Sequence, residues 1–386
     1  MSFELPGRDV IEGLAQRVYE LLTARISHIP GEKPRQKERR VERSEAEYWE
    51  AAAELSQMVL GPAARLLGKK RLVIVTQGAL QRVPFAALPV PVGHPQGQKL
   101  FAINGYIPLV ADHEITSLPS ASTLAALRCD LAGRRAAQLS VAILADPVFK
   151  RDDERILAIL GGNKARGQDN YVPTWSQSTN REGGLNAATS DGSLPRLLTT
   201  RWEAEKIASL APAGQSKLAL DFAASVETVM SGKLARYRIV HFATHALINN
   251  EQPELSAIAL SMFDETGRSR EGLLRLRDIF SMKLPVELVV LSACRTGLGK
   301  QVRGEGTLGL TRGFMYAGAP RVVVSLWSLE DKATAEFMVR FYRNMLGQQK
   351  LSPASALRRV QIETMKDSRW RSPFFWAAFV LQGEWR

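Results

Sequence analysis

Residues 237–245 read YRIVHFATH, a mostly apolar run of seven residues that a threonine and a histidine follow directly. Three other apolar runs have the same form, at residues 141–145, 287–293 and 321–327. Strands that are buried on both faces give such continuous apolar runs, and they are typical of parallel sheets. We therefore expect these four runs to form the centre of one parallel sheet.

Helical spacing of apolar residues separates the strand candidates. It predicts helices over six segments: 200–210, 225–234, 272–280, 307–316, 332–346 and 353–366. Alternation of strands and helices indicates an α/β fold whose sheet is covered by helices on both faces.

The first 66 residues have a different pattern. Helical spacing over 9–27 and 42–66 predicts a helical N-terminal segment, with the basic, Pro- and Gly-containing stretch 29–41 as the connection. A strand candidate at 71–77 then begins the sheet domain, which we place at residues 67–386. Residues 161–193 are rich in Gly, Asn, Ser and Thr and have no periodicity, so we expect a mobile insertion there.

Composition excludes several classes of protein. The 386 residues are 45% hydrophobic, which excludes disorder, and 51 Lys and Arg against 39 Asp and Glu give a net charge of +12. The basic residues are spread along the chain, which argues against direct binding of nucleic acid. Two cysteines cannot form a disulfide framework. The first residues lack the basic and apolar regions typical of a leader peptide, and no apolar run is long enough to predict a membrane span. We expect a cytoplasmic protein.

Ligands of parallel sheets bind at the carboxyl ends of the strands, so the residues after each run are the candidates for chemistry. His245 follows the run at 237–243, and Cys294 follows the run at 287–293. If these strands are neighbours, the imidazole can take the proton of the thiol, which at its ordinary pKa of about 8.5 is mostly protonated at neutral pH. His241, inside the strand, is interpreted as a core histidine, and Cys129, in a helical stretch, as a packing residue.

These residues resemble the signature of a known family. The segments YRIVHFATH (237–245), LSACRTG (291–297), GEGT (304–307), FMYAGAPRVVVSLW (314–327) and FFWAAFVLQG (374–383) look like those of the CHAT family of caspase-like cysteine peptidases. The resemblance implies a three-layer α/β/α sandwich with a mostly parallel sheet. It also implies thiol peptidase activity, with Cys294 as nucleophile, His245 as general base, and no metal or organic cofactor.

The resemblance further assigns site residues. The oxyanion would be held by the backbone N–H groups of Cys294 and of the residue after the histidine, which is Ala246 here and usually glycine in such peptidases. Ser292 is a candidate substrate-binding residue. It stands two residues before the cysteine, where peptidases that cleave after Arg or Lys often carry an acid, so the resemblance implies no preference for a basic residue before the cut. Glu305 and Asp331 are candidates to face the substrate; bonding to backbone amides of their own loops is the alternative for each.

Two other interpretations compete with the peptidase. Residues 304–309, GEGTLG, match a dinucleotide-binding fingerprint, but the preceding strand ends some ten residues earlier, too far for the tight turn that this motif requires. The second alternative is a caspase-like scaffold that binds proteins without cleaving them, and Ala246 favours it. The family resemblance implies a protein substrate, a regulatory protein partner bound through the N-terminal helices, and a role in bacterial signalling or defence.

Overall fold

The computed structural model describes residues 1–93, 102–160, 194–249, 252–292 and 305–385. The insertion expected at 161–193 and the position of Cys294 lie outside these ranges. Among the described residues, no helix combines the length and the apolar character that crossing a membrane requires.

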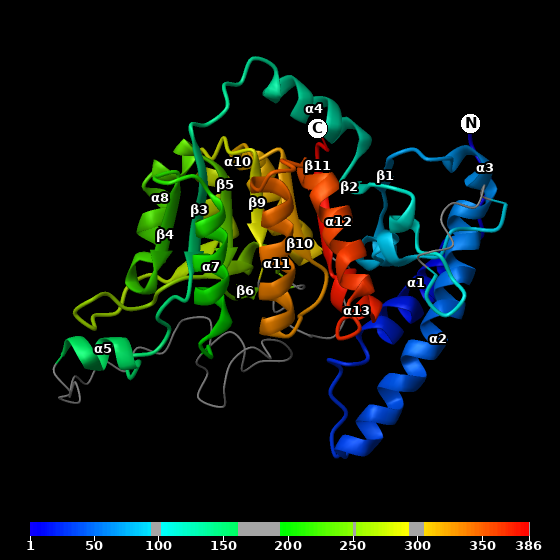
Figure 1. The fold of residues 1–386 in the computed structure, drawn as a ribbon, viewed down its shortest axis with the longest axis horizontal. Coiled ribbons are helices and arrows are strands. Elements are labelled where there is room, and N and C mark those ends of the chain that lie inside the picture. Colours follow the sequence, from blue (N-terminus) through cyan, green and yellow to red (C-terminus); the bar gives the residue numbers. More distant parts are fainter. Residues whose placement is uncertain (94–101, 161–193, 250–251, 293–304, 386) are drawn as a thin grey trace.

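An eight-stranded sheet forms the centre of the molecule (Figure 1). Its order is β1-β2-β11-β10-β9-β5-β3-β4, and every neighbouring pair is parallel except β10 and β11. The mostly parallel sheet predicted from the apolar runs is confirmed. The strands are β1 (Leu72–Val75), β2 (Ile115–Leu118), β3 (Leu139–Ala145), β4 (Ser216–Leu220), β5 (Tyr237–Ala243), β9 (Leu288–Leu291), β10 (Arg321–Ser325) and β11 (Phe379–Gly383).

Helices cover both faces of this sheet. Two successive residues of β3 belong to the cores on the two faces. Ile143 belongs to a core shared with α7, α11 and α12, and Leu144 belongs to a core shared with α8, α9 and α10. The helices are α1 (Arg8–Thr23), α2 (Pro34–Leu60), α3 (Ala64–Leu67), α4 (Ala121–Leu131), α5 (Glu154–Ile159), α7 (Thr199–Leu210), α8 (Val226–Met230), α9 (Leu276–Ser281), α10 (Glu305–Ala317), α11 (Asp331–Leu346), α12 (Pro353–Lys366) and α13 (Pro373–Trp376).

The N-terminal helices α1 and α2 pack into the same core as α11 and α12. The Tyr19 ring meets the Trp327 ring edge-on at 6.3 Å, and the Tyr19 hydroxyl donates a hydrogen bond to the Leu326 carbonyl at 3.3 Å. Helix α2 begins at Pro34, so most of the basic stretch expected as a connection is helical; proline fits the first helical position because that N–H needs no partner. The domain boundary at residue 66 stays a prediction.

A small antiparallel sheet, β6-β7-β8, directly follows β5. It consists of β6 (Ala246–Leu247), β7 (Ala257–Ala259) and β8 (Leu273–Arg275). The helix predicted over 272–280 is therefore wrong in its first part, because Leu273 and Leu274 pair with β7 and bury their side chains there. The helix starts only at Leu276, where the Asp278 carboxylate accepts a hydrogen bond from the Arg275 N–H at 2.9 Å.

Candidate active site

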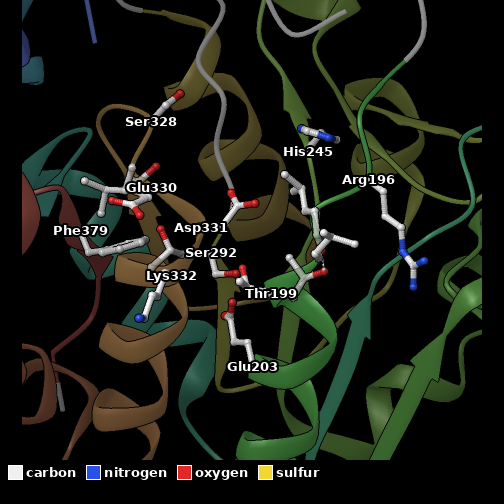
Figure 2. A pocket seen from close by; sticks show the side chains of 16 residues that line it. Arg196, Thr199, Glu203, His245, Ser292, Ser328, Glu330, Asp331, Lys332 and Phe379 are labelled. Carbon is white, nitrogen blue, oxygen red and sulfur yellow. Dashed lines mark hydrogen bonds between the residues drawn. The ribbon is translucent and has the colours of Figure 1, made fainter. Parts of the chain in front are cut away.

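The carboxyl ends of β5, β9 and β10 lie side by side. Phe242 is paired with Leu291, and Leu291 with Val324, so the three chains leave the sheet at the same edge. The neighbouring arrangement of β5 and β9 predicted from the sequence is thus confirmed. A cavity of about 490 Å³ opens at this edge, lined by His245, Ser292 and Asp331 among others (Figure 2).

His245 is fully buried in the cavity wall. Its Nε2 lies 2.7 Å from the carbonyl oxygen of Pro195. Its ring packs against the Phe149 ring, with centroids 5.4 Å apart. The preceding Thr244 donates a hydrogen bond from its hydroxyl to the Ala259 carbonyl at 2.6 Å, which ties the end of β5 to the small sheet. The imidazole is therefore held from several sides.

Arg196 anchors the short segment that supplies the Pro195 carbonyl. Its guanidinium makes two hydrogen bonds to the Asp146 carboxylate, Nε to Oδ1 at 2.7 Å and Nη2 to Oδ2 at 2.8 Å. This bond to Asp146 raises the pKa of Arg196 above its ordinary value. In Figure 2 the Arg196 side chain points away from the residues at the centre of the cavity, so it acts on the site through its backbone.

Asp146 follows β3 directly, and its side chain is fully buried. Its Oδ2 also accepts a hydrogen bond from Arg201 at 2.9 Å, and Arg155 donates to its backbone carbonyl at 2.6 Å. Asp221 completes the cluster by accepting from Arg155 at 2.7 Å and from Arg201. Burial acts to raise the pKa of Asp221, but the hydrogen bonds from the two arginines outweigh it and hold that pKa below its ordinary value.

A second buried network lies beneath the cavity. His241 is fully buried, with its Nε2 2.9 Å from Glu203 Oε1 and its Nδ1 3.1 Å from the Tyr342 hydroxyl. This agrees with its interpretation as a core histidine. Burial, and then the charge of Glu203, raise the pKa of Tyr342 well above its ordinary value. Glu203 also lines the cavity, a position that the strand-end argument missed because Glu203 lies on helix α7.

Ala246 begins β6 and pairs with Ile258 of β7. The Ala259 N–H donates to the His245 carbonyl at 2.9 Å, so His245 and Ala259 form the hydrogen-bonded pair. In an antiparallel ladder the next pair along makes no backbone hydrogen bonds, and the Ala246 N–H therefore points away from β7. The pairing of β6 with β7 therefore does not use the Ala246 N–H group.

The remaining predicted residues have different positions. Ser292 is buried, and its N–H extends the pairing with β5 by donating to the Phe242 carbonyl at 3.0 Å. Asp331 is the first residue of α11 and lies in the cavity lining with Glu330 and Lys332. Glu305 is the first residue of α10. In the described ranges, no three His, Cys, Asp or Glu side chains come together as a metal site requires.

Cys129 corrects one expectation. It lies on α4 but is exposed, so its interpretation as a packing residue is wrong. The apolar pattern around it is satisfied by Leu127, which is the buried residue of that helix. This exposed thiol provides an internal reference for the reactivity of Cys294.

The CHAT domain matches residues 50–384, which is most of the sequence. The chain belongs to the CHAT domain family. This confirms the resemblance drawn from the motifs. The human tetratricopeptide repeat protein 28 is 30% identical over 250 residues, a match that covers 55% of this chain and 10% of that protein. The CHAT chain thus spans about a tenth of the length of this relative.

Two solved structures also resemble the CHAT chain. The separase of Saccharomyces cerevisiae, in complex with securin, gives a TM-score of 0.42 at 13% identity, covering 99% of this chain and 23% of that chain. Gingipain R (RgpB), an Arg-specific cysteine proteinase of Porphyromonas gingivalis, gives a TM-score of 0.47 at 9% identity, covering 87% of this chain and 67% of that chain.

Proposed function

We propose that the CHAT chain is a cysteine endopeptidase that cleaves a partner protein at a limited number of sites, with His245 and Cys294 as its dyad. The observation that carries this proposal is the hydrogen bond of His245 to the Pro195 carbonyl at 2.7 Å. A carbonyl only accepts, so this bond requires the proton on Nε2 and makes Nδ1 the basic nitrogen of the neutral ring.

The covalent geometry of the chain supports a short distance between the Cys294 thiol and the His245 imidazole. Cys294 follows Ser292 by two residues, and two residues of extended chain span at most about 7 Å. Ser292 and His245 line the same cavity. A thiol near the basic Nδ1 would transfer its proton there, and the resulting thiolate is the nucleophilic form of cysteine.

The proposed reaction then follows in two steps. The Cys294 sulfur attacks the carbonyl carbon of the scissile bond while the N–H groups of Ala246 and Cys294 hold the oxyanion. His245 returns its proton to the leaving amine, and a water molecule releases the acyl group from sulfur. The fixed Pro195 carbonyl stabilises the imidazolium that exists between these transfers. No step uses a metal or an organic cofactor.

The wider role rests on the family alone. We propose a regulated bacterial system, in signalling or defence, in which cleavage changes the activity of one protein substrate, and a regulatory protein that acts through α1 and α2. The contacts of Tyr19 with Leu326 and Trp327 support the second point, because they connect α1 to the chain that leads to Asp331.

New protein N-termini in cells that express the chain provide the test. We expect termini that appear with the wild type and with Cys129→Ala and that are missing with Cys294→Ala and His245→Ala. Cys129→Ala is the matched control, because it removes the exposed cysteine instead of the proposed nucleophile. Termini that persist in Cys294→Ala would refute the proposal. The same termini pattern in all four strains would favour the alternative, a scaffold that binds proteins without cleaving them.

A further inference from the structure

A second cavity, of about 710 Å³, lies at the opposite edge of the sheet, where the central strands begin. Its floor includes Ser140, Ile239, Leu288 and Arg321, which stand at the starts of β3, β5, β9 and β10. Figure 1 shows α4 and the chain after it arching over this edge. The chain after α4, the connection between α11 and α12, and the connections that lead into β4 and β9 also contribute to the lining.

The charge of this cavity is strongly unbalanced. One carboxylate, Glu287, faces it, and both of its oxygens are bonded to Arg238 at 2.9 Å. Four further cationic side chains belong to the lining: Arg134, Arg135, Arg321 and Lys350. The cavity therefore presents an excess of positive charge to its contents.

Arg321 is the decisive residue because it is only 9% exposed. Its Nη1 donates to the Glu287 backbone carbonyl at 3.2 Å, whereas its Nε has no hydrogen-bond partner. In the part of the chain that the structure describes, no carboxylate forms an ion pair with it. Burial lowers the pKa of Arg321 from its ordinary value, because the charged guanidinium loses its hydration there. The carboxylates of Glu287 and Glu384 attract this cation without forming an ion pair with it, so its burial is only partly compensated, and an anion in the cavity would compensate it further.

We propose that this cavity binds a small organic phosphate, of the size of a nucleoside diphosphate. Guanidinium groups bind phosphate oxygens through paired hydrogen bonds, and several cations suit a group with more than one negative charge. The volume lies within the range of about 300–1,000 Å³ typical of small-molecule sites. Apolar side chains in the lining, such as Ile239, Leu288, Met345 and Leu346, provide a surface for the organic part.

Titration calorimetry of the full chain with three probes tests this site without any reference to peptidase activity. ADP carries the phosphates and an organic body, pyrophosphate carries the phosphates alone, and adenosine carries the body alone. We expect ADP to bind, pyrophosphate to bind more weakly, and adenosine not to bind. Adenosine binding as tightly as ADP, or no ADP binding at a dissociation constant below about 1 mM, would overturn the proposal.

Three variants distinguish the cavity from general attraction to a basic protein. Arg321→Met removes the buried charge and should weaken ADP binding at least about 10-fold, because the charge-assisted hydrogen bonds from the guanidinium to the phosphate are lost. Since an apolar side chain replaces a buried and only partly compensated cation, the ligand-free variant should unfold at the same temperature as the wild type or higher.

The exposed Arg135 provides a second variant, which leaves the core untouched, and Arg135→Ala should weaken binding about 2-fold. Arg65→Ala, an exposed arginine on α3 outside the cavity, is the matched control and should bind as the wild type does. ADP binding that Arg321→Met leaves unchanged, or that Arg65→Ala weakens equally, would overturn the assignment.

Discussion

Asp146→Asn is the substitution that most directly tests how the CHAT chain holds its proposed base. Asparagine has nearly the same shape and tolerates the φ of 50° at this position, so the change removes charge and little else. Asp146 accepts two hydrogen bonds from Arg196 and one from Arg201 through its side chain. One of its oxygens becomes an NH₂ group, which cannot accept from a guanidinium.

The expected loss of stability follows from these three bonds. The bond to the oxygen that becomes NH₂ is lost, which costs about 1.5–3 kcal/mol for a hydrogen bond to a charged group, and the bonds to the remaining oxygen weaken because the carboxylate charge is gone. The total, about 3 kcal/mol, agrees with the cost of about 3–5 kcal/mol for breaking a buried ion pair. For a chain of this length, such a loss corresponds to a decrease in Tm of about 4 °C.

Urea unfolding measures the effect, and Asp152→Asn is the matched control. Asp152 is exposed and lies six residues further along the chain, so its substitution should change the free energy of unfolding by less than about 0.5 kcal/mol. Equal urea midpoints for Asp146→Asn and Asp152→Asn would refute the reasoning about the buried cluster.

NMR adds a readout at the base itself. The Nε2 proton of His245, identified by its loss in His245→Gln, should exchange with solvent about 10-fold faster in Asp146→Asn, because Arg196 no longer fixes the Pro195 carbonyl. A loss of global stability with unchanged protection of this proton would contradict the link between Asp146 and His245.

Three further outcomes follow from the structure. Burial acts to raise the pKa values of Asp153 and Asp221, but hydrogen bonds from arginines outweigh it and hold both pKa values below their ordinary range. The stability that these two carboxylates add is therefore present above about pH 4 and is lost as the pH falls through the lowered pKa values. A urea midpoint that rises between about pH 4 and pH 2 would contradict this. Gly383 has a φ of 111°, and an added Cβ would overlap the Pro320 carbonyl. Gly383→Ala should therefore lower the free energy of unfolding in urea by at least about 2 kcal/mol. A loss below about 0.5 kcal/mol, which is typical of surface substitutions, would be inconsistent with this backbone. Trp327→Ala should cost about 3–5 kcal/mol, because the ring is fully buried against Tyr19 and Phe374, and a midpoint near that of the wild type would contradict this packing.

The centre of the fold could be predicted because its strands are buried on both faces. Continuous apolar runs revealed β3, β5, β9 and β10, and the rule that sites follow such strands selected His245. Strands β2 and β4 were missed, since the sequences ITSL and SKLAL mix polar and apolar residues and resemble loops. Strand β8 was missed because two consecutive leucines fit a helix as well as a strand.

The site shows the same division between local pattern and tertiary contact. Asp146 directly follows the run at 141–145, so the rule that selected His245 would have selected it as well. Its partners Arg196 and Arg201 lie beyond residues 161–193, and no local spacing indicates that the fold brings them back to Asp146. The carbonyl of Pro195 carries no signal in the side-chain sequence at all.

The central claim is that His245 activates Cys294, and alkylation of the two cysteines by iodoacetamide at pH 6 tests it most directly. An ordinary thiol is almost fully protonated at this pH and reacts slowly, as the exposed Cys129 should. We predict that Cys294, followed by mass spectrometry, reacts at least about 10-fold faster than Cys129 and loses this advantage in His245→Ala. Equal rates for both cysteines, unchanged in His245→Ala, would contradict the account.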